Sequence, residues 1–497
     1  MTLSKIGQSY LFHIFLLLSI CLVFIYYSWV GYIGSDDWVY IENARARIAE
    51  PFMIGQDHWQ VRLPLTWPMA LSFLALGESE LAAALPTLLY FVALVLLNYL
   101  LISKVKDRQT ALLSSTLLAT SPLLLVNATS LRVDTVETFW VIASLLIFYL
   151  SVYKNGNGLL LVLVGITAGI SFVTRPTVVG LLVYYFILFA SGYGKNRSQY
   201  MLILLGFILI WGTETIYYWM NTGTPLYRFH LDYHHDTIDR SKTSNFGVFL
   251  DPIFLLLFNQ GFGILFWLLP FASYGLLRSP DLKSKPRLDY FLLGFVITWL
   301  LFVFLLTRKL VLDARYLAPA TVAALILVAS WLSLMCSQGK RGMAGLLFSG
   351  IIVTNIVCLY LENKNPIYAE RWLVELAKLS TEPIYTDPQT EERARFLLEL
   401  DNTATKVHPL VAPPGSLFLS VPINAARGQY NAYRWNASDF APGNWQIVDK
   451  LNPENRIIAR PFEWFGLDKL VPSNFYKKIC CPNSPIILYR NDGNGVK

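Results

Sequence analysis

Charged side chains are scarce in this sequence. Asp, Glu, Lys and Arg make up 15% of its 497 residues, against about 25% in an ordinary soluble domain, while 55% of the residues are apolar. One water-soluble core rarely grows beyond about 250–300 residues, so it cannot bury that much apolar surface. The composition therefore excludes a disordered chain, a collagen-like rod and a cytosolic enzyme, and it indicates a protein that crosses the membrane several times.

Cysteines are also few. The five cysteines are spaced neither as zinc ligands nor as a disulfide framework. Cys480 and Cys481 are adjacent and form either two ordinary thiols or, outside the cytosol, a strained vicinal disulfide. The net charge of +7 does not indicate a nucleic-acid partner, because in a membrane protein the positions of Lys and Arg near span ends matter more than their sum.

Long apolar runs, by contrast, recur through the first 361 residues. A helix needs about 20 apolar residues to cross the hydrocarbon layer, and about eleven stretches qualify. The first run is too long for a signal peptide and lacks a small-residue cleavage site, so we expect a retained anchor. The predicted fold class is mostly α, a polytopic transmembrane helix bundle. The expected spans are 10–31, 81–103, 110–127, 134–153, 158–173, 177–193, 199–220, 252–277, 289–307, 317–335 and 343–361.

Basic residues in the short loops predict the orientation. All of them fall on one side if the spans alternate, and Lys and Arg mark the cytoplasmic side. An odd number of spans then places residues 362–497 outside, together with long loops at 32–80 and 221–251. We therefore expect a transmembrane domain, 1–361, and an extracytoplasmic domain, 362–497. The basic positions are Lys5, 104–108, Lys154, 195–197, 283–287 and 340–341.

The composition changes sharply in the tail. Residues 370–378 and 391–400 repeat apolar side chains at helical spacing, whereas 383–387, 416–421 and 485–489 are typical of short strands. The tail is therefore predicted to be a small α/β domain.

Two adjacent carboxylates, Asp36 and Asp37, follow the first span directly. Such a pair repels itself at a membrane surface and resists desolvation, so it needs either free water or a function. One interpretation is a solvated helix N-terminus, where Asp is favoured; the other is a catalytic site. Two histidines in the second loop, His230 and His234, would share one helix face, a spacing that can also bind a divalent metal together with Asp232 or Asp236.

The order of such features resembles the polyprenyl-phosphate-sugar-dependent glycosyltransferases of the GT-C class, close to the protein O-mannosyltransferases and the lipid A aminoarabinose transferases. Val39 and Ala84 depart from the pattern, since these relatives carry Arg there. The matching elements are Asp36-Asp37 with Tyr40, Glu42 and Arg45; Arg62-Leu63-Pro64; Gly77-Glu78-Ser79-Glu80 before Leu85-Pro86; Asp134; Thr174-Arg175-Pro176; Thr222-Gly223-Thr224-Pro225-Leu226; and Arg315-Tyr316-x-x-Pro319.

The resemblance implies a membrane enzyme that transfers a sugar from a polyprenyl-phosphate donor to a lipid, glycan or protein acceptor, outside a bacterial inner membrane. A carboxylate would deprotonate the acceptor hydroxyl in one inverting displacement, and cations would hold the departing phosphate. We expect no resident cofactor. The expected catalytic residues are Asp36, as the base, Asp37 and Asp134; Arg62, Arg175 and Arg315 would bind phosphate; and Tyr40, His58, Glu214, His230 and His234 would bind substrate.

Other interpretations stay open at this point. The arginines also suit a topological role at the membrane surface, where long cationic side chains reach out to water. Glu214, inside a predicted span, is either paired within the bundle or lines a cavity. A transporter or flippase of lipid-linked glycans would need many spans too, but it usually shows paired internal repeats, which this sequence lacks. A scaffold that displays the tail would not need carboxylates and arginines at outer span ends.

Overall fold

The computed structural model describes residues 3–154, 158–236, 247–278, 287–306, 313–362, 365–409, 412–421, 445–452, 459–464, 466, 469, 480 and 485–491. The chain divides into two compact units. The helical unit comprises Met1–Gly31 and Val39–Glu362, and the tail unit comprises Tyr32–Trp38 and Asn363–Lys497. The short segment after the first helix thus belongs with the distant C-terminal part of the chain.

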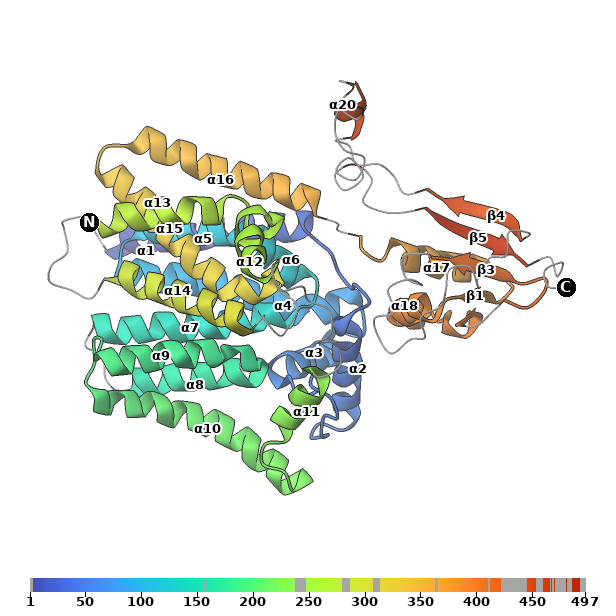
Figure 1. Ribbon diagram of the computed structural model, residues 1–497, viewed down its shortest axis with the longest axis horizontal. Helices are drawn as coiled ribbons and strands as arrows, with labels where there is room; N and C mark the ends of the chain where they lie inside the picture. Colours follow the sequence, from blue (N-terminus) through green and yellow to red (C-terminus); the bar gives the residue numbers. More distant parts are fainter. Residues whose placement is uncertain are drawn as a thin grey trace. The chain divides into compact units, whose positions relative to one another are not determined.

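The helical unit consists of long apolar helices with short connections (Figure 1). Its elements are α1 (Leu3–Tyr27), α2 (Asp36–Ala49), α3 (Leu63–Leu76), α4 (Glu80–Val105), α5 (Arg108–Ala119), α6 (Pro122–Thr129), α7 (Val133–Tyr153), α8 (Gly158–Thr174), η1 (Pro176–Val178), α9 (Val179–Ser191), α10 (Arg197–Thr222), α11 (Tyr227–Asp236), α12 (Gly247–Phe258), η2 (Gln260–Phe262), α13 (Leu265–Leu277), α14 (Leu288–Leu306), η3 (Ala314–Leu317), α15 (Ala318–Ser337) and α16 (Arg341–Leu361).

Seven helices within the described residues are long and apolar enough to cross a membrane, or eight if the bent pair α5 and α6 forms one span. The predicted helix bundle is therefore confirmed, whereas the number eleven is not. Three predicted spans, 158–173, 177–193 and 252–277, correspond to helices of 10–17 residues.

Two predicted continuous spans are wrong in detail, because local turn chemistry breaks them. The span at 110–127 bends by 55° between α5 and α6, where Pro122 opens the second helix. The span at 252–277 is split, since the Asn259 side chain accepts from the backbone N–H of Gly261 and Gly263 has φ +54. The side-chain hydrogen bond of Asn259 and the positive φ of Gly263 are both features that end an α-helix.

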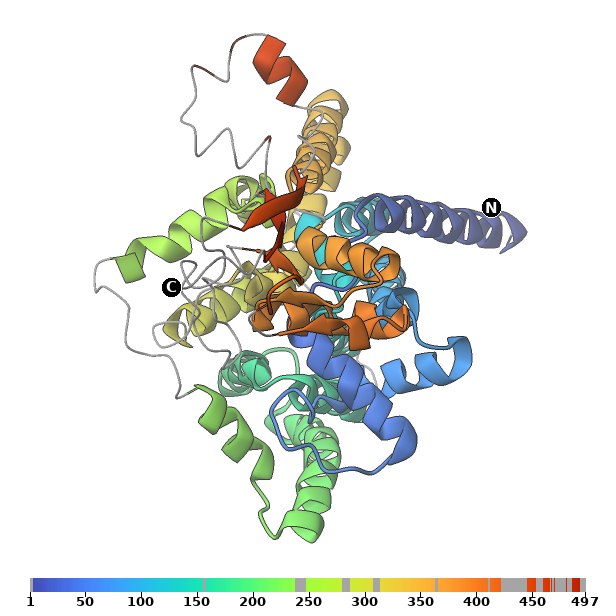
Figure 2. The same ribbon diagram turned by 90° about the vertical axis from the view of Figure 1, so that its right-hand side faces the viewer.

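Small residues let α8 and α10 approach closely. A Cβ at Gly165 would lie 2.0 Å from the carbonyl oxygen of Ile203, and one at Gly206 would lie 2.1 Å from that of Val162. Because only glycine fits at such backbone contacts, these two positions fix the packing of the pair. Helices α7, α8, α9 and α10 form one set of neighbouring rods in Figure 1, and Figure 2 views the set nearly end-on.

The tail unit is a small α/β fold, as predicted. Strand β1 pairs in parallel with β2 and β3, whereas β5 runs antiparallel to β3 and β4, which gives the order β2-β1-β3-β5-β4. Strands β1, β3 and β5 match the predicted ones, while β2 and β4 were not predicted. Helices α17 and α18, orange in Figure 2, pack together. The elements are α17 (Tyr368–Leu379), β1 (Ile384–Thr386), α18 (Pro388–Leu400), η4 (Ala404–Lys406), β2 (Val407–His408), β3 (Leu417–Ser420), β4 (Gln446–Leu451), α20 (Ala459–Trp464) and β5 (Ile486–Arg490).

Candidate active site

A buried ion-pair cluster lies where α7 begins and α8 ends. Arg175 Nη1 forms an ion pair with Asp134 Oδ1 and lies 3.7 Å from Glu137 Oε2. Thr177 Oγ1 donates to the other oxygen of Glu137 at 2.6 Å. Asp134 and Glu137 are only 1% and 2% exposed. Charges buried this deeply persist only when they are paired, so Arg175 holds both carboxylates in place.

The local sequence explains why Arg175 faces α7. Pro176 follows it, and the residue before proline is disfavoured in helical conformation, so α8 ends at Thr174. Arg175 is accordingly extended, with φ −159 and ψ 133. Burial disfavours the guanidinium charge, but Asp134, Tyr316 and Glu137 together outweigh that effect and raise the pKa of Arg175, which stays charged.

A second arginine, Arg315, joins the cluster from η3, just before α15. The guanidinium carbon of Arg175 lies 4.4 Å from the centre of the Tyr316 ring, and that of Arg315 lies 5.5 Å from the same ring. Asp313 caps η3 by accepting from the backbone N–H of Arg315 at 3.0 Å, which fixes the arginine at the first turn. Tyr316 is thus stacked by both cations.

Arg62 completes the set. Its Nη1 donates to the hydroxyl of Tyr40, and the side chain is buried just before α3. The positive charges of Arg175, Arg315, Arg132 and Arg62 all act on the carboxylate of Asp134. Of the three arginines predicted to bind phosphate, Arg175 pairs with Asp134 directly, Arg315 shares the Tyr316 ring with Arg175, and Arg62 acts on Asp134 through its charge. Arg132, Glu137 and Thr177 were not singled out in the sequence.

One carboxylate oxygen of this cluster receives no hydrogen bond from the described residues. Asp134 Oδ2 is buried and forms no hydrogen bond with the residues that the structure describes. An ionised carboxylate is an acceptor only, so this oxygen is suited to a hydroxyl or N–H donor of a bound molecule. The cluster can hold an anion on its guanidinium groups and a hydroxyl on Asp134.

Asp37 organises the segment Tyr32–Trp38, which belongs to the tail unit. Its carboxylate accepts from the backbone N–H groups of Ile33 and Ser35, both at 2.6 Å, and of Trp38 at 3.2 Å. Burial raises the pKa of Asp37 to about 6, although the hydrogen bonds from Ile33 and Ser35 act in the opposite direction. Asp36 precedes it in the first turn of α2 and is half-buried.

The tail holds this segment through close contacts with α18. Gly34 has φ +60, and a Cβ there would lie 2.7 Å from the backbone oxygen of Arg393. The Tyr32 ring lies 5.2 Å from that of Phe396, between ring centres. Arg393 is itself fixed by an ion pair with Glu370 at 2.5 Å. The tail unit therefore sets the conformation of the segment that carries Asp36 and Asp37.

Helix α2 connects the two units along the chain. Its residues Asp36, Asp37 and Trp38 cluster with the tail, while Tyr40 and the remainder of the helix belong to the helical unit. Asp36 and Tyr40 are four residues apart, so they lie on the same face of this helix.

The other predicted substrate-binding residues do not join the arginine cluster in any contact we describe. His58 is buried and stacks on Trp59, with ring centres 3.7 Å apart. Glu214 forms a buried ion pair with Arg228 at 2.6 Å, which favours the paired interpretation over a cavity-lining role. Arg228 was missed because a single arginine in a polar loop carries no pattern of its own.

The histidines of the second loop lie on α11. His230 is exposed, and for His234 the structure describes the backbone alone. Among the described residues no three His, Cys, Asp or Glu side chains gather as metal ligands. Asp232 lies 3.9 Å from Arg228 Nε. Cys481 lies outside the described residues, so the predicted alternatives for the cysteine pair stay untested.

Comparison with known proteins supports the resemblance seen in the motifs. Residues 63–219 match the family model of dolichyl-phosphate-mannose-protein mannosyltransferases. The structure is similar to that of ArnT from Cupriavidus metallidurans in the apo state, with a TM-score of 0.59 and 12% identity over 89% of this chain and 96% of that chain. A search of curated proteins by sequence finds no match.

ArnT bound to undecaprenyl phosphate is similar to the same degree, with a TM-score of 0.57 and 15% identity over 87% of this chain and 95% of that chain. At such identities the likeness establishes the fold. The predicted GT-C-like fold is therefore confirmed, and the chain is an integral membrane protein.

Proposed function

We propose that this protein is a membrane glycosyltransferase that moves a sugar from a polyprenyl-phosphate donor to a lipid, glycan or protein acceptor outside the cytoplasm. The observation that carries the proposal is the buried arginine cluster around Asp134. It is supported by the fold, which is shared with an ArnT that was crystallised with undecaprenyl phosphate. We place the enzyme in a bacterial inner membrane, with its reaction on the periplasmic side.

The phosphate of the donor would lie on Arg62, Arg175 and Arg315. A guanidinium group binds phosphate oxygens with two parallel hydrogen bonds, and it stays charged at every relevant pH. When the bond between sugar and phosphate breaks, negative charge grows on the phosphate. Pre-positioned cations in a water-poor site stabilise that charge without having to reorganise. Arg62 should contribute most to phosphate binding, since Val39 stands at a position where the related enzymes carry an arginine.

Asp36 would act as the general base. The acceptor hydroxyl oxygen attacks the anomeric carbon, its proton passes to Asp36, and the polyprenyl phosphate leaves with the electron pair of the broken C–O bond. One displacement of this kind inverts the configuration of the sugar. Asp37 suits this role less, because its oxygens already accept three backbone hydrogen bonds and fix the loop. We expect no metal to be needed, since the arginines supply the positive charge.

The test is to incubate the purified protein with a panel of polyprenyl-phosphate sugars and candidate acceptors, with and without a chelator. A glycosyltransferase consumes one donor and releases polyprenyl phosphate. A flippase of lipid-linked glycans leaves every donor chemically intact but moves it across a vesicle membrane. Turnover that is abolished by chelator and restored by one divalent metal would argue against an arginine-only site.

With the donor known, Asp36→Asn should reduce turnover by roughly 10²- to 10⁴-fold, because the amide cannot accept a proton. Asp37→Asn is the neighbouring comparison and should cost less. Activity in Asp36→Asn together with a dead Asp37→Asn would reverse the two roles. If both variants are active, the general-base mechanism is wrong.

Arg62→Ala should weaken donor use by about 10- to 150-fold, the equivalent of a lost charge-assisted contact of about 1.5–3 kcal/mol. Arg62→Lys should recover only part of this, because a point charge lacks the planar fork. Arg45→Ala is the matched control, since Arg45 forms its ion pairs with Glu42 and Glu78 at partly exposed positions. Equal losses in Arg62→Ala and Arg45→Ala would mean that general charge, rather than a specific phosphate contact, is being measured.

A further inference from the structure

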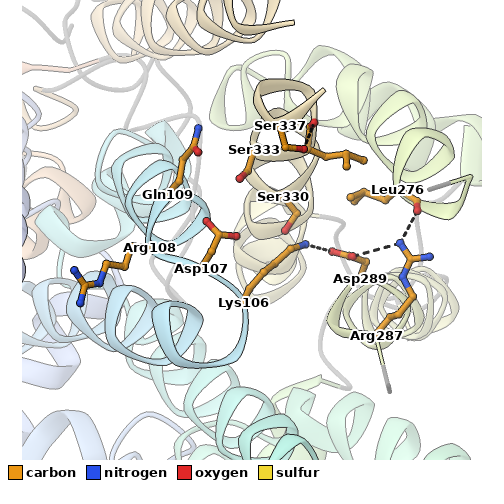
Figure 3. Close-up of a pocket in the computed structure, with 11 residues that line it drawn as sticks. Lys106, Asp107, Arg108, Gln109, Leu276, Arg287, Asp289, Ser330, Ser333 and Ser337 are labelled. Carbon is orange, nitrogen blue, oxygen red and sulfur yellow. Dashed lines mark hydrogen bonds and ion pairs between the residues drawn. The ribbon is translucent and has the colours of Figure 1, made fainter. Parts of the chain in front are cut away.

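A cavity whose wall carries several polar side chains lies in the helical unit, away from the arginine cluster. It has a volume of about 500 Å³ and lies among the α4–α5 corner, the end of α13, the start of α14 and the last turns of α15 (Figure 3). Its wall includes Ser330, which follows Arg315 by about 15 residues, or about 22 Å along a helix. The cavity is therefore separate from the proposed catalytic site, and it lies at the end of the bundle predicted to be cytoplasmic.

Two buried polar groups in this wall lack partners. Ser330 is 1% exposed, and its hydroxyl forms no hydrogen bond with the described residues. The Arg287 side chain is 8% exposed, and its Nε–H likewise has no partner there, although Nη2 donates to the carbonyl of Leu276 at 2.6 Å. A buried donor without an acceptor is unfavourable, so these groups are arranged for an acceptor that the protein does not itself supply.

The charges around the cavity favour an anion. Lys106, Arg108 and Arg287 outnumber Asp107 and Asp289. Asp107 already caps α5, with its oxygens accepting from the backbone N–H and the hydroxyl of Thr110. Asp289 is shared between Lys106, at 2.6 Å, and Arg287, at 3.8 Å. Asp289 is therefore paired, whereas the hydrogen bonds of Asp107 come from neutral groups, so the charged side chains of the wall sum to +1.

Hydroxyl groups add to this wall. Ser333 and Ser337 continue the hydroxyl row of Ser330 along α15. The first turn of α5 also lies at the wall, but Asp107 already caps it. A guanidinium, an ammonium and hydroxyls together match a tetrahedral anion with several acceptor oxygens.

We propose that this cavity binds a phosphate group, carried either by the headgroup of a membrane lipid or by a soluble phosphate compound. Arg287 Nε and the Ser330 hydroxyl donate to the phosphate oxygens, and Lys106 in the same wall adds a positive charge. The proposal does not depend on the glycosyltransferase assignment, because it concerns a different set of residues and requires no turnover.

The test uses the full chain purified in detergent and stripped of lipid. Native mass spectrometry and thermal shift would compare phosphatidylglycerol, diacylglycerol and glycerol phosphate as probes. Retention of phosphatidylglycerol but not of the other two identifies a lipid headgroup site. Binding of glycerol phosphate with similar affinity identifies a soluble phosphate compound. Equal retention of diacylglycerol, or no binding of either phosphate probe, would overturn the proposal.

Two substitutions locate the site. Arg287→Gln should weaken phosphate binding about tenfold or more, whereas Arg278→Gln, which removes the same charge from a residue outside the cavity wall, should change it little. Ser330→Ala should also weaken binding. In the absence of ligand, however, it should leave the melting temperature unchanged or raise it, because it removes a hydroxyl that has no partner.

Weaker phosphate binding together with an unchanged or higher melting temperature distinguishes a ligand-binding hydroxyl from a structural one. If Ser330→Ala destabilises the ligand-free protein and leaves phosphate binding unchanged, the hydroxyl serves packing and the proposal is wrong. Ser103→Ala on α4 is the control for serine removal, since its hydroxyl is exposed and donates to the carbonyl of Leu100. Ser103→Ala should change neither phosphate binding nor the melting temperature.

Discussion

Replacing Gly34 by alanine should loosen the segment Tyr32–Trp38 from helix α18. The new Cβ would lie 2.7 Å from the backbone oxygen of Arg393 and 2.8 Å from its Cβ, where ordinary contacts are 3.4–4 Å. Neither atom can rotate away, because one is backbone and the other is attached directly to it. The segment or the helix must therefore shift, and the hydrogen bonds that Asp37 accepts should open more often.

The expected size follows from two contributions. An L-residue at the left-handed φ of +60 costs about 1–2 kcal/mol, and overpacking of a rigid contact adds about 1–3 kcal/mol. Gly415→Ala isolates the first contribution, since Gly415 lies in the tail unit at φ +86 with no atom within 4 Å of its Cβ position. The difference between the two variants, about 1–3 kcal/mol, corresponds to about 5- to 150-fold in the opening equilibrium.

Hydrogen exchange of the Ile33 and Ser35 amides measures that opening directly, because both amides donate to Asp37. Exchange there should be faster in Gly34→Ala than in Gly415→Ala, while peptides from the buried helix α15 provide an internal reference for global unfolding. Equal protection of both amides in the two variants would refute the close contact with α18 as the feature that fixes this segment.

Three further predictions follow from the charged groups and the orientation. Burial raises the pKa of Asp37 to about 6, so as the pH rises from about 4 to 6 the unfolded chain loses this proton before the folded protein does. The free energy of unfolding should therefore fall over that pH interval. Thermal melts of Asp37→Asn should not show this pH dependence. Glu214→Ala leaves the buried Arg228 with only its longer contact to Asp232, at 3.9 Å, and should cost up to about 3–5 kcal/mol, seen as a lower melting temperature that Arg228→Met partly restores. Single cysteines at Ser35 and at Ser416 should both react with an impermeant reagent in intact cells; reaction of only one would mean that a span is miscounted.

Much of the fold could be predicted because apolar run length is a strong signal. A run of about 20 apolar residues leaves few alternatives to a membrane helix. The breaks were harder to predict. Asn259 and Gly263 interrupt a run that is otherwise apolar enough to continue, and their effect depends on a single side-chain hydrogen bond. Strand β4 was missed as well, since its residues are exposed and show no alternation of buried and exposed positions.

The candidate site was partly predictable for a different reason. Arg62, Arg175 and Arg315 could be singled out because the proposed phosphate chemistry requires cations at outer span ends, and each lies beside a proline or at a helix start. Glu137 was not found, since a lone carboxylate one turn after Asp134 resembles an ordinary helix residue. Its pairing with Arg175 depends on how α7 and α8 pack, which local sequence does not determine.

The proposed chemistry depends on the preference for Asp36 over Asp37 as the base, for which the sequence alone offers no physical reason. Asp36 and Asp37 are identical in type and differ only in what surrounds them. Asp37 is buried and committed to the backbone of its own loop, and that loop is fixed by α18, which begins more than 300 residues later in the chain. A carboxylate used in this way cannot also approach an acceptor hydroxyl without releasing the loop. The general base should therefore be Asp36, and the tail should affect the reaction through the conformation of the segment on which Asp36 lies.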